Sequence, residues 1–146
     1  MAPLRIRGPW RLALISAALL ASSCQWAGDT KAVHVSFAAL KSQLDDVNTR
    51  LNSAIQNGET DRVVGLDKEL NTVLDAAVNQ SSAMNILDRE HLSIAVATAR
   101  RCITDMDRYS TSGDVDLLRA QAQQLAPTVT EIQELLDRAE RSTKAS

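Results

Sequence analysis

The sequence predicts an all-α protein and, more specifically, an antiparallel up-down four-helix bundle. From about residue 30 onward, apolar residues recur at spacings of three and four, which places them along one side of a helix. Short stretches rich in Gly, Asn and Ser interrupt this pattern, and the alternation typical of strands is missing. Apolar residues make up 45% of the chain and aromatic residues only 3%, which favours closely packed aliphatic helices.

The first helix is expected to begin after Thr30, a residue suited to the N-cap position, and to end at Asn57-Gly58. Its apolar stripe consists of Val33, Phe37, Leu40, Leu44, Val47, Leu51 and Ala54. Thr60 is the predicted cap of a second helix, in which Gly65 lowers helix stability by up to about 1 kcal/mol. The stripe of this helix consists of Val63, Leu66, Leu70, Val73, Leu74 and Ala77. A turn is predicted over 79–85, a small and polar stretch.

The third helix is expected to end at Ser112-Gly113, and Asp114 is the predicted cap of the fourth. The third stripe consists of Leu92, Ala95, Val96, Ala99, Cys102, Ile103, Met106 and Tyr109. The fourth consists of Val115, Leu118, Ala122, Leu125, Val129, Ile132, Leu136 and Ala139. Pro127 interrupts the last helix, but the stripe keeps its phase across it. A single kinked helix is therefore favoured over a break with Thr128-x-x-Glu131 as a new capping box.

The N-terminal 23 residues have the pattern of an export signal. Arg5, Arg7 and Arg11 precede the uncharged, apolar segment 12–21, and two small serines then lead to Cys24. An apolar run of about ten residues is too short to cross a bilayer about 30 Å thick. The segment is therefore predicted to be removed rather than retained as a transmembrane helix.

This segment resembles the signal peptide of bacterial lipoproteins, whose lipobox reads Leu, two small residues and Cys. Here Leu20 stands one position early and Ala21 takes its place. The resemblance implies that Cys24 is lipidated and becomes the first residue of the mature protein. With Gln25 rather than Asp next, it implies transfer to the outer membrane in a diderm bacterium. Ordinary signal cleavage after Ala21-x-Ser23 is the alternative.

Three segments follow from this interpretation: a signal peptide over 1–23, a tether over 24–30 and a helical domain over 31–144. Six extended residues reach only about 20 Å, so the domain would lie close to the bilayer, with Trp26 at the interface or in a disordered stub. After Cys24 the chain carries 13 of the 16 basic and all 18 acidic residues, a formal net charge of −5. Nucleic acid is therefore not an expected partner, and membrane attachment would depend on the lipid at Cys24.

The histidines and the cysteines are the residues of this sequence that could bind a metal or act as reactive groups. Asp88 and His91 lie three residues apart and resemble half of the Glu-x-x-His element of di-iron bundles, but His34 is the only other histidine and has no such companion. His91 is interpreted as a boundary histidine, and neither a metal nor another cofactor is expected. Cys102 falls in the apolar stripe, where a thiol is inert. If Cys24 is not lipidated, a Cys24–Cys102 disulfide is the alternative.

The function expected from the sequence is that of a non-enzymatic, lipid-anchored protein of the cell envelope that binds or organises another envelope protein. No nucleophile or acid–base pair stands out. Ile86, Leu87 and Ile94 lie away from the apolar stripe of the third helix, which makes them the candidate contact surface. The alternative is a periplasmic helical bundle that senses a ligand or metal through Met84, Asp88 and His91.

Overall fold

The computed structural model describes residues 35–145, and the helices it contains confirm the all-α prediction. Its α-helices are α1 (Phe37–Gln56), α2 (Thr60–Gln80), α3 (Ile86–Ser112) and α4 (Val115–Lys144). A short 3-10 helix, η1 (Ser81–Ala83), lies between α2 and α3, and residues 35–145 contain no strand. The predicted signal peptide, the tether and Cys24 lie outside the described residues.

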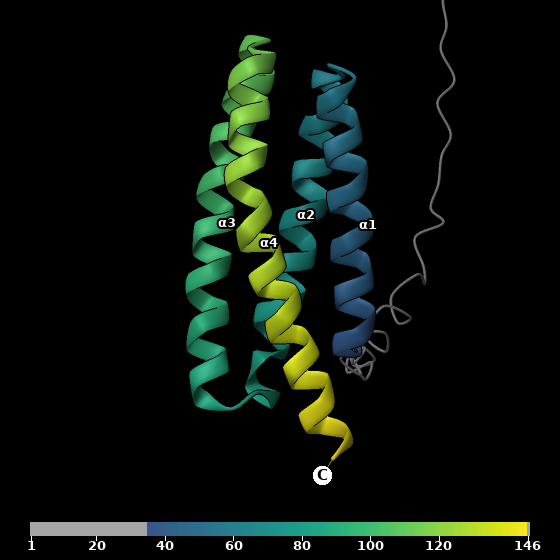
Figure 1. Cartoon of the computed structure of the whole chain (residues 1–146), viewed down its shortest axis with the longest axis vertical. Helices are drawn as coiled ribbons and strands as arrows, with labels where there is room; N and C mark the ends of the chain where they lie inside the picture. The colour runs from purple at the N-terminus through teal and green to yellow at the C-terminus, as the bar shows by residue number, and fades with distance from the viewer. Residues whose placement is uncertain (1–34, 146) are drawn as a thin grey trace, which may run out of the picture. The chain divides into compact units, whose positions relative to one another are not determined.

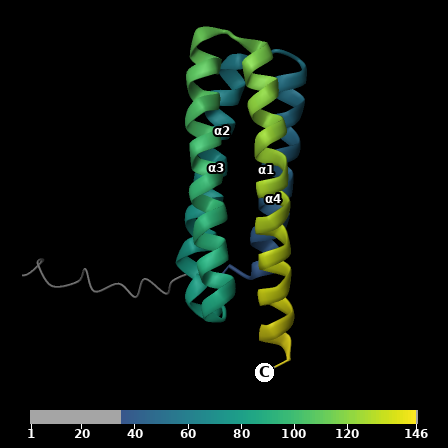
Figure 2. The same cartoon turned by 60° about the vertical axis from the view of Figure 1, so that its left-hand side comes forward.

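The helices form a bundle in which each packs against the next along the chain, and α1 also packs against α4 (Figures 1 and 2). The side chains between them form one continuous core, built mainly from Leu, Val, Ile and Ala. The predicted stripes supply most of this core, because spacings of three and four keep their residues on one side of each helix. Leu135 and Ile55 are also fully enclosed, although they lie beside the predicted stripes. No helix between residues 35 and 145 combines the length and the apolarity needed to cross a bilayer.

Three helix ends fall where the sequence predicts them. Gly58 follows α1 with φ of 71°, and Gly113 follows α3 with φ of 74°. Glycine adopts this left-handed conformation without the steric cost that a Cβ atom adds, so both positions favour helix termination. At the start of α4, Asp114 Oδ1 accepts a hydrogen bond from Leu117 N at 3.1 Å, which confirms the predicted cap.

The predicted starts of the first two helices are wrong. α1 begins at Phe37, and its N-cap is Ser36, whose hydroxyl accepts a hydrogen bond from Ala39 N at 3.1 Å. α1 therefore begins later than expected, and Thr30, the predicted cap, lies outside the described residues. Thr60 is the first residue of α2 rather than its cap, because Glu59 occupies that position without a side-chain capping bond.

The predicted turn over 79–85 is shorter than expected. α2 continues through Gln80, and η1 then leads to Asn85, the N-cap of α3. Asn85 Oδ1 accepts a hydrogen bond from Asp88 N at 2.9 Å.

α4 continues through Pro127, as the unbroken phase of its stripe predicts. Pro127 itself is exposed, whereas Thr128 is buried in the bundle. The alternative interpretation, a new segment capped at Thr128, is therefore wrong. A proline lacks the N–H group that would bond to the preceding turn, but an exposed position leaves the affected carbonyl accessible to water.

Candidate functional site

The candidate contact surface lies at the beginning of α3. Ile86, Leu87 and Ile94 expose 65%, 70% and 66% of their surface, and we call these three residues the α3 patch. Leu87 and Ile94 lie seven residues apart, which places them on the same side of the helix about two turns from each other. The structure therefore confirms that these side chains point away from the core.

Local structure explains the exposure of the α3 patch. The capping bond to Asn85 fixes Ile86 and Leu87 as the first two residues of α3. The core contacts of the segment are made instead by Met84 and Leu92, both of which are buried. A group of large apolar side chains that is exposed to solvent and does not pack in the core is typical of surfaces that bind another molecule.

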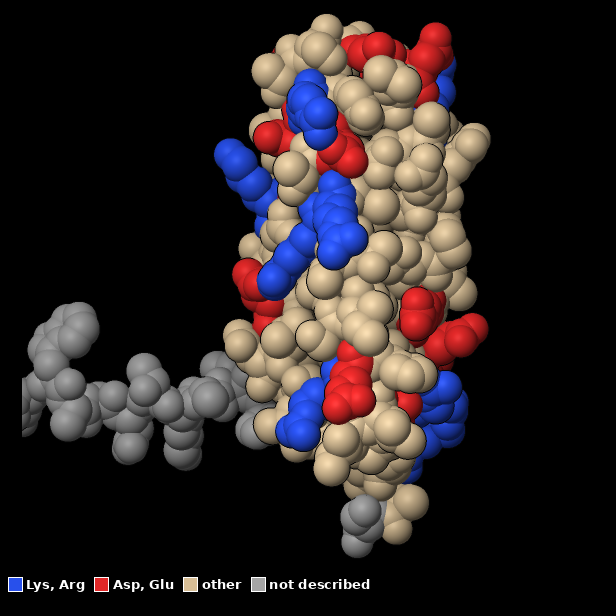
Figure 3. Space-filling view, turned by 90° about the vertical axis from the view of Figure 1, so that its left-hand side faces the viewer, with Lys and Arg blue, Asp and Glu red and all other residues tan. Residues whose placement is uncertain are grey.

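Beside the later part of α3, the surface of the bundle carries an uncharged area. Figure 3 shows the face on which α3 lies, where acidic and basic side chains gather in clusters and the upper part of the side toward α4 is largely uncharged. This agrees with the sequence of α4, whose segment 120–130 contains no Asp, Glu, Lys or Arg. This uncharged area does not adjoin the α3 patch, because α4 approaches the start of α3 through its charged segment 131–141, where Arg138 reaches Asp88.

The residues of the alternative, metal-sensing interpretation have different environments. Met84 is buried, His91 is exposed, and Asp88 is bound by two neighbours. Asn85 Nδ2 donates to Asp88 Oδ2 at 2.6 Å, and Arg138 Nη2 lies 3.2 Å from Asp88 Oδ1. Across residues 35–145, no three His, Cys, Asp or Glu side chains come together in a way that would hold a metal ion.

Cys102 lies where the sequence predicts it. Its side chain is 7% exposed and belongs to the core together with Ala99 and Met106. Within the described residues it is a free cysteine. A cysteine buried in this way packs as a small apolar side chain.

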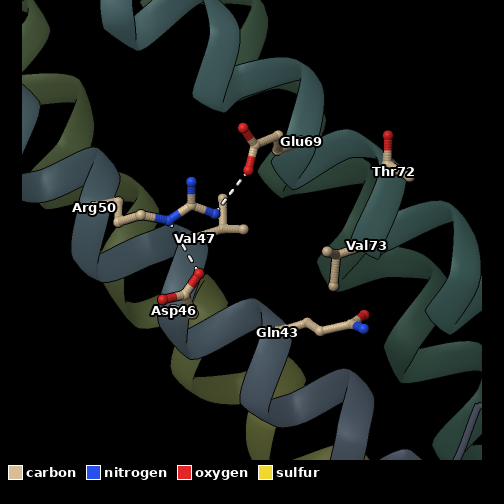
Figure 4. A pocket seen from close by; sticks show the side chains of 7 residues that line it. All are labelled: Gln43, Asp46, Val47, Arg50, Glu69, Thr72 and Val73. Carbon is tan, nitrogen blue, oxygen red and sulfur yellow. Dashed lines mark hydrogen bonds and ion pairs between the residues drawn. The ribbon is translucent and has the colours of Figure 1, made fainter.

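A groove between α1 and α2 forms a pocket of about 300 Å³ (Figure 4). Val47 and Val73 supply its apolar wall, and Arg50 reaches across it. The guanidinium is already neutralised, because its Nε lies 3.0 Å from Asp46 and its Nη2 lies 2.7 Å from Glu69. The hydrogen bond to Glu69 is the main cause of the raised pKa of Arg50. The groove therefore offers no unpaired positive charge for an anion.

The sequence interpretation missed one residue with unusual chemistry. Asp67 of α2 is only 3% exposed, and neither carboxylate oxygen accepts a hydrogen bond from any residue within 35–145. Burial, and secondly the charge of Asp107, raises the pKa of Asp67 to about 7. A signal was present: Asp67 lies four residues after Val63 and three before Leu70, so it falls on the buried side of α2.

Comparison of the chain with protein-family models, with curated proteins and with solved structures gives no match.

Proposed function

We propose that this protein is a lipid-anchored component of the bacterial cell envelope whose helical bundle binds or organises a second envelope protein. The N-terminal segment supports the anchor, because it combines a basic start, a short apolar run and small residues before Cys24. The net charge of −5 after Cys24 supports attachment through lipid rather than through a basic surface. We further propose that the protein has no enzymatic activity.

The observation that carries the binding proposal is the α3 patch. Its three aliphatic side chains are each about two-thirds exposed. Full burial of such a side chain contributes roughly 1.5–3 kcal/mol. Removing the α3 patch from water by contact with a partner would therefore contribute substantially to the free energy of binding.

We also propose that the bundle has the antiparallel up-down topology. The connections 57–59 and 113–114 are short, which favours reversal of the chain between neighbouring helices. Contacts between distant segments support it: Lys41, near the start of α1, pairs with Asp137, near the end of α4, at 2.6 Å. Arg138 likewise reaches Asp88 at the start of α3.

The anchor is tested by producing the full chain in a diderm bacterium and measuring the mass of its N-terminal peptide. We expect a peptide that begins at Cys24 and carries acyl chains. The Cys24→Ser variant should lose the adduct and leave the membrane fraction, whereas Cys102→Ser should retain both. A mature chain that begins elsewhere, or an unmodified Cys24, would contradict the anchor.

The contact surface is tested in cells by placing a photo-crosslinking amino acid at Ile94 of the anchored protein. The matched control position is Ser53, which is also exposed but lies on α1. We expect one defined protein adduct from position 94 that falls at least tenfold when Leu87 is changed to Gln. Circular dichroism should show that Leu87→Gln leaves the fold intact. Equal crosslinking from both positions, or no dependence on Leu87, would contradict the proposed surface.

A further inference from the structure

Asp67 lies in a pocket of about 190 Å³ between α2 and α3. Its side chain is 97% removed from solvent, and both of its oxygens are without hydrogen-bond donors among residues 35–145. A buried carboxylate normally has such donors or a counter-charge, because an unpaired buried charge is strongly unfavourable. The carboxyl group of Asp67 therefore lacks the partners that would stabilise its charged form.

Three further side chains with oxygen atoms that can bind a cation line the same pocket. Asn71 lies one helical turn after Asp67 on α2, and Thr104 and Asp107 lie one turn apart on α3. The hydroxyl of Thr104 donates its hydrogen to Arg100 O at 2.9 Å, which leaves the lone pairs of its oxygen available to a ligand. The pocket therefore combines two carboxylates, an amide and a hydroxyl from two different helices.

We propose that this pocket binds a hard divalent cation, Mg²⁺ or Ca²⁺, through Asp67 and Asp107, with Asn71 and Thr104 as additional oxygen ligands. Carboxylate, amide and hydroxyl oxygens are the ligands that these ions prefer, and the pocket contains no imidazole or thiol that would favour a softer metal. A volume of about 190 Å³ also accommodates several waters of roughly 30 Å³ each, so the ion keeps part of its hydration shell.

The charges around the pocket determine how strongly the ion binds. Asp107 faces Asp67 from α3, and Lys68 of α2 lines the same pocket. Within residues 35–145, no ion pair joins the ammonium of Lys68 to either carboxylate, so it does not occupy the place of the cation. Its positive charge nevertheless opposes a second cation. With only two carboxylates, we expect dissociation constants of about 10⁻⁴–10⁻³ M.

The bound ion would link α2 to α3 and so stabilise the folded protein, independently of the function proposed above.

The experiment is thermal unfolding of the purified protein at pH 8 in MgCl₂ or CaCl₂, compared with NaCl plus EDTA at equal ionic strength. At about ten times the dissociation constant we expect at least one of the two ions to raise Tm by roughly 3–5 °C. Asp67→Asn and Asp107→Asn should each abolish the increase. Glu131→Gln removes an exposed carboxylate of α4 and should retain it, which controls for a general effect of charge.

Two further measurements separate ligand binding from a purely structural role of Asp67. Isothermal titration calorimetry with the same ion should show saturable binding to the parent protein and none to Asp67→Asn. Lys68→Met should strengthen binding several-fold. The proposal is overturned if neither ion raises Tm, if the increase persists in Asp67→Asn, or if calorimetry detects no binding to the parent protein.

Discussion

Asp88 at the start of α3 pairs with Arg138 near the end of α4, with Arg138 Nη2 3.2 Å from Asp88 Oδ1. The same carboxylate accepts a hydrogen bond from Asn85 Nδ2, while Asp88 N donates to Asn85 Oδ1. The side chain of Asp88 is 17% exposed and thus partly withdrawn from solvent. Asp88 therefore stabilises the first turn of α3 and joins it to α4, instead of remaining available to a metal ion.

The first prediction concerns this pair. Asp88→Ala should lower the free energy of unfolding by about 1 kcal/mol, because it removes the ion pair and a negative charge from a helix N-terminus. Arg138→Gln should cost about 0.5 kcal/mol, since exposed pairs contribute little. Urea unfolding of both variants and of the double variant measures the coupling between them. Strictly additive effects would show that the pair contributes nothing.

The second prediction concerns His91, the residue that the metal-sensing alternative requires. The His91 side chain is exposed and its neighbour Asp88 is occupied, so His91→Ala should leave the effect of Zn²⁺ on Tm unchanged. Thermal unfolding with and without Zn²⁺ checks this, with Ser93→Ala as a control at a nearby exposed position. A Zn²⁺-dependent increase in Tm that only His91→Ala abolishes would revive the alternative.

The third prediction contrasts two glycines. Gly65 is in the middle of α2, and a Cβ atom there would meet no atom within 4 Å. Gly65→Ala should therefore stabilise the protein by roughly 0.5–1 kcal/mol through the lower conformational entropy of the unfolded chain. Gly113→Ala also meets open space, but φ of 74° strains any residue with a Cβ, so it should destabilise by about 1 kcal/mol. Changes of the same sign in urea unfolding would contradict this explanation.

The fourth prediction compares the observed and the expected caps. Ser36→Ala removes the hydrogen bond to Ala39 N and should cost about 1 kcal/mol. Thr60→Ala should cost only a few tenths of a kcal/mol, because Thr60 occupies the first turn of α2 and makes no capping bond. The two free energies of unfolding, measured by urea titration, distinguish the positions. A larger loss for Thr60→Ala would mean that the cap of α2 is misassigned.

Periodicity predicted the helices well because burial itself follows the helical repeat. The stripe of α4 keeps its phase across Pro127, and the structure accordingly has one helix there. Helix starts were predicted less well, since several residues near an end have capping side chains. Ser36 and Thr30 are chemically similar residues, and the structure has the capping bond at Ser36, next to the buried Phe37.

The candidate site was predictable only in part, and the reason is physical. Exposure of Ile86, Leu87 and Ile94 follows from their position off the stripe, which the sequence reveals directly. The pocket at Asp67 depends on which residues of α3 face α2. That relation is set by the rotation of the two helices about their axes, which a periodic pattern in either helix alone does not specify.

The last prediction is the pH dependence of stability in EDTA. The pKa of Asp67 is about 7 in the folded protein, against an ordinary value of 3.8, so folding favours the protonated form. Between about pH 4 and pH 7 the folded chain retains a proton that the unfolded chain has lost. The contribution of this group to stability therefore falls as the pH rises through this range, and it is constant below and above it.

Asp67→Asn should be close to neutral at pH 4, where the carboxyl group of the parent is protonated in the folded state and only about half ionised in the unfolded state. At pH 8 it should be more stable than the parent, because the parent then contains a buried charge that the amide lacks. A shift of about three pKa units corresponds to an upper limit on the order of 4 kcal/mol, and the buried amide offsets part of it. Guanidinium unfolding of both proteins from pH 4 to pH 8 measures the difference, in which the titration of all other groups largely cancels. If the difference in free energy of unfolding between the two proteins stays constant with pH, Asp67 ionises normally in the folded protein. Only a pKa that changes on folding makes this difference depend on pH.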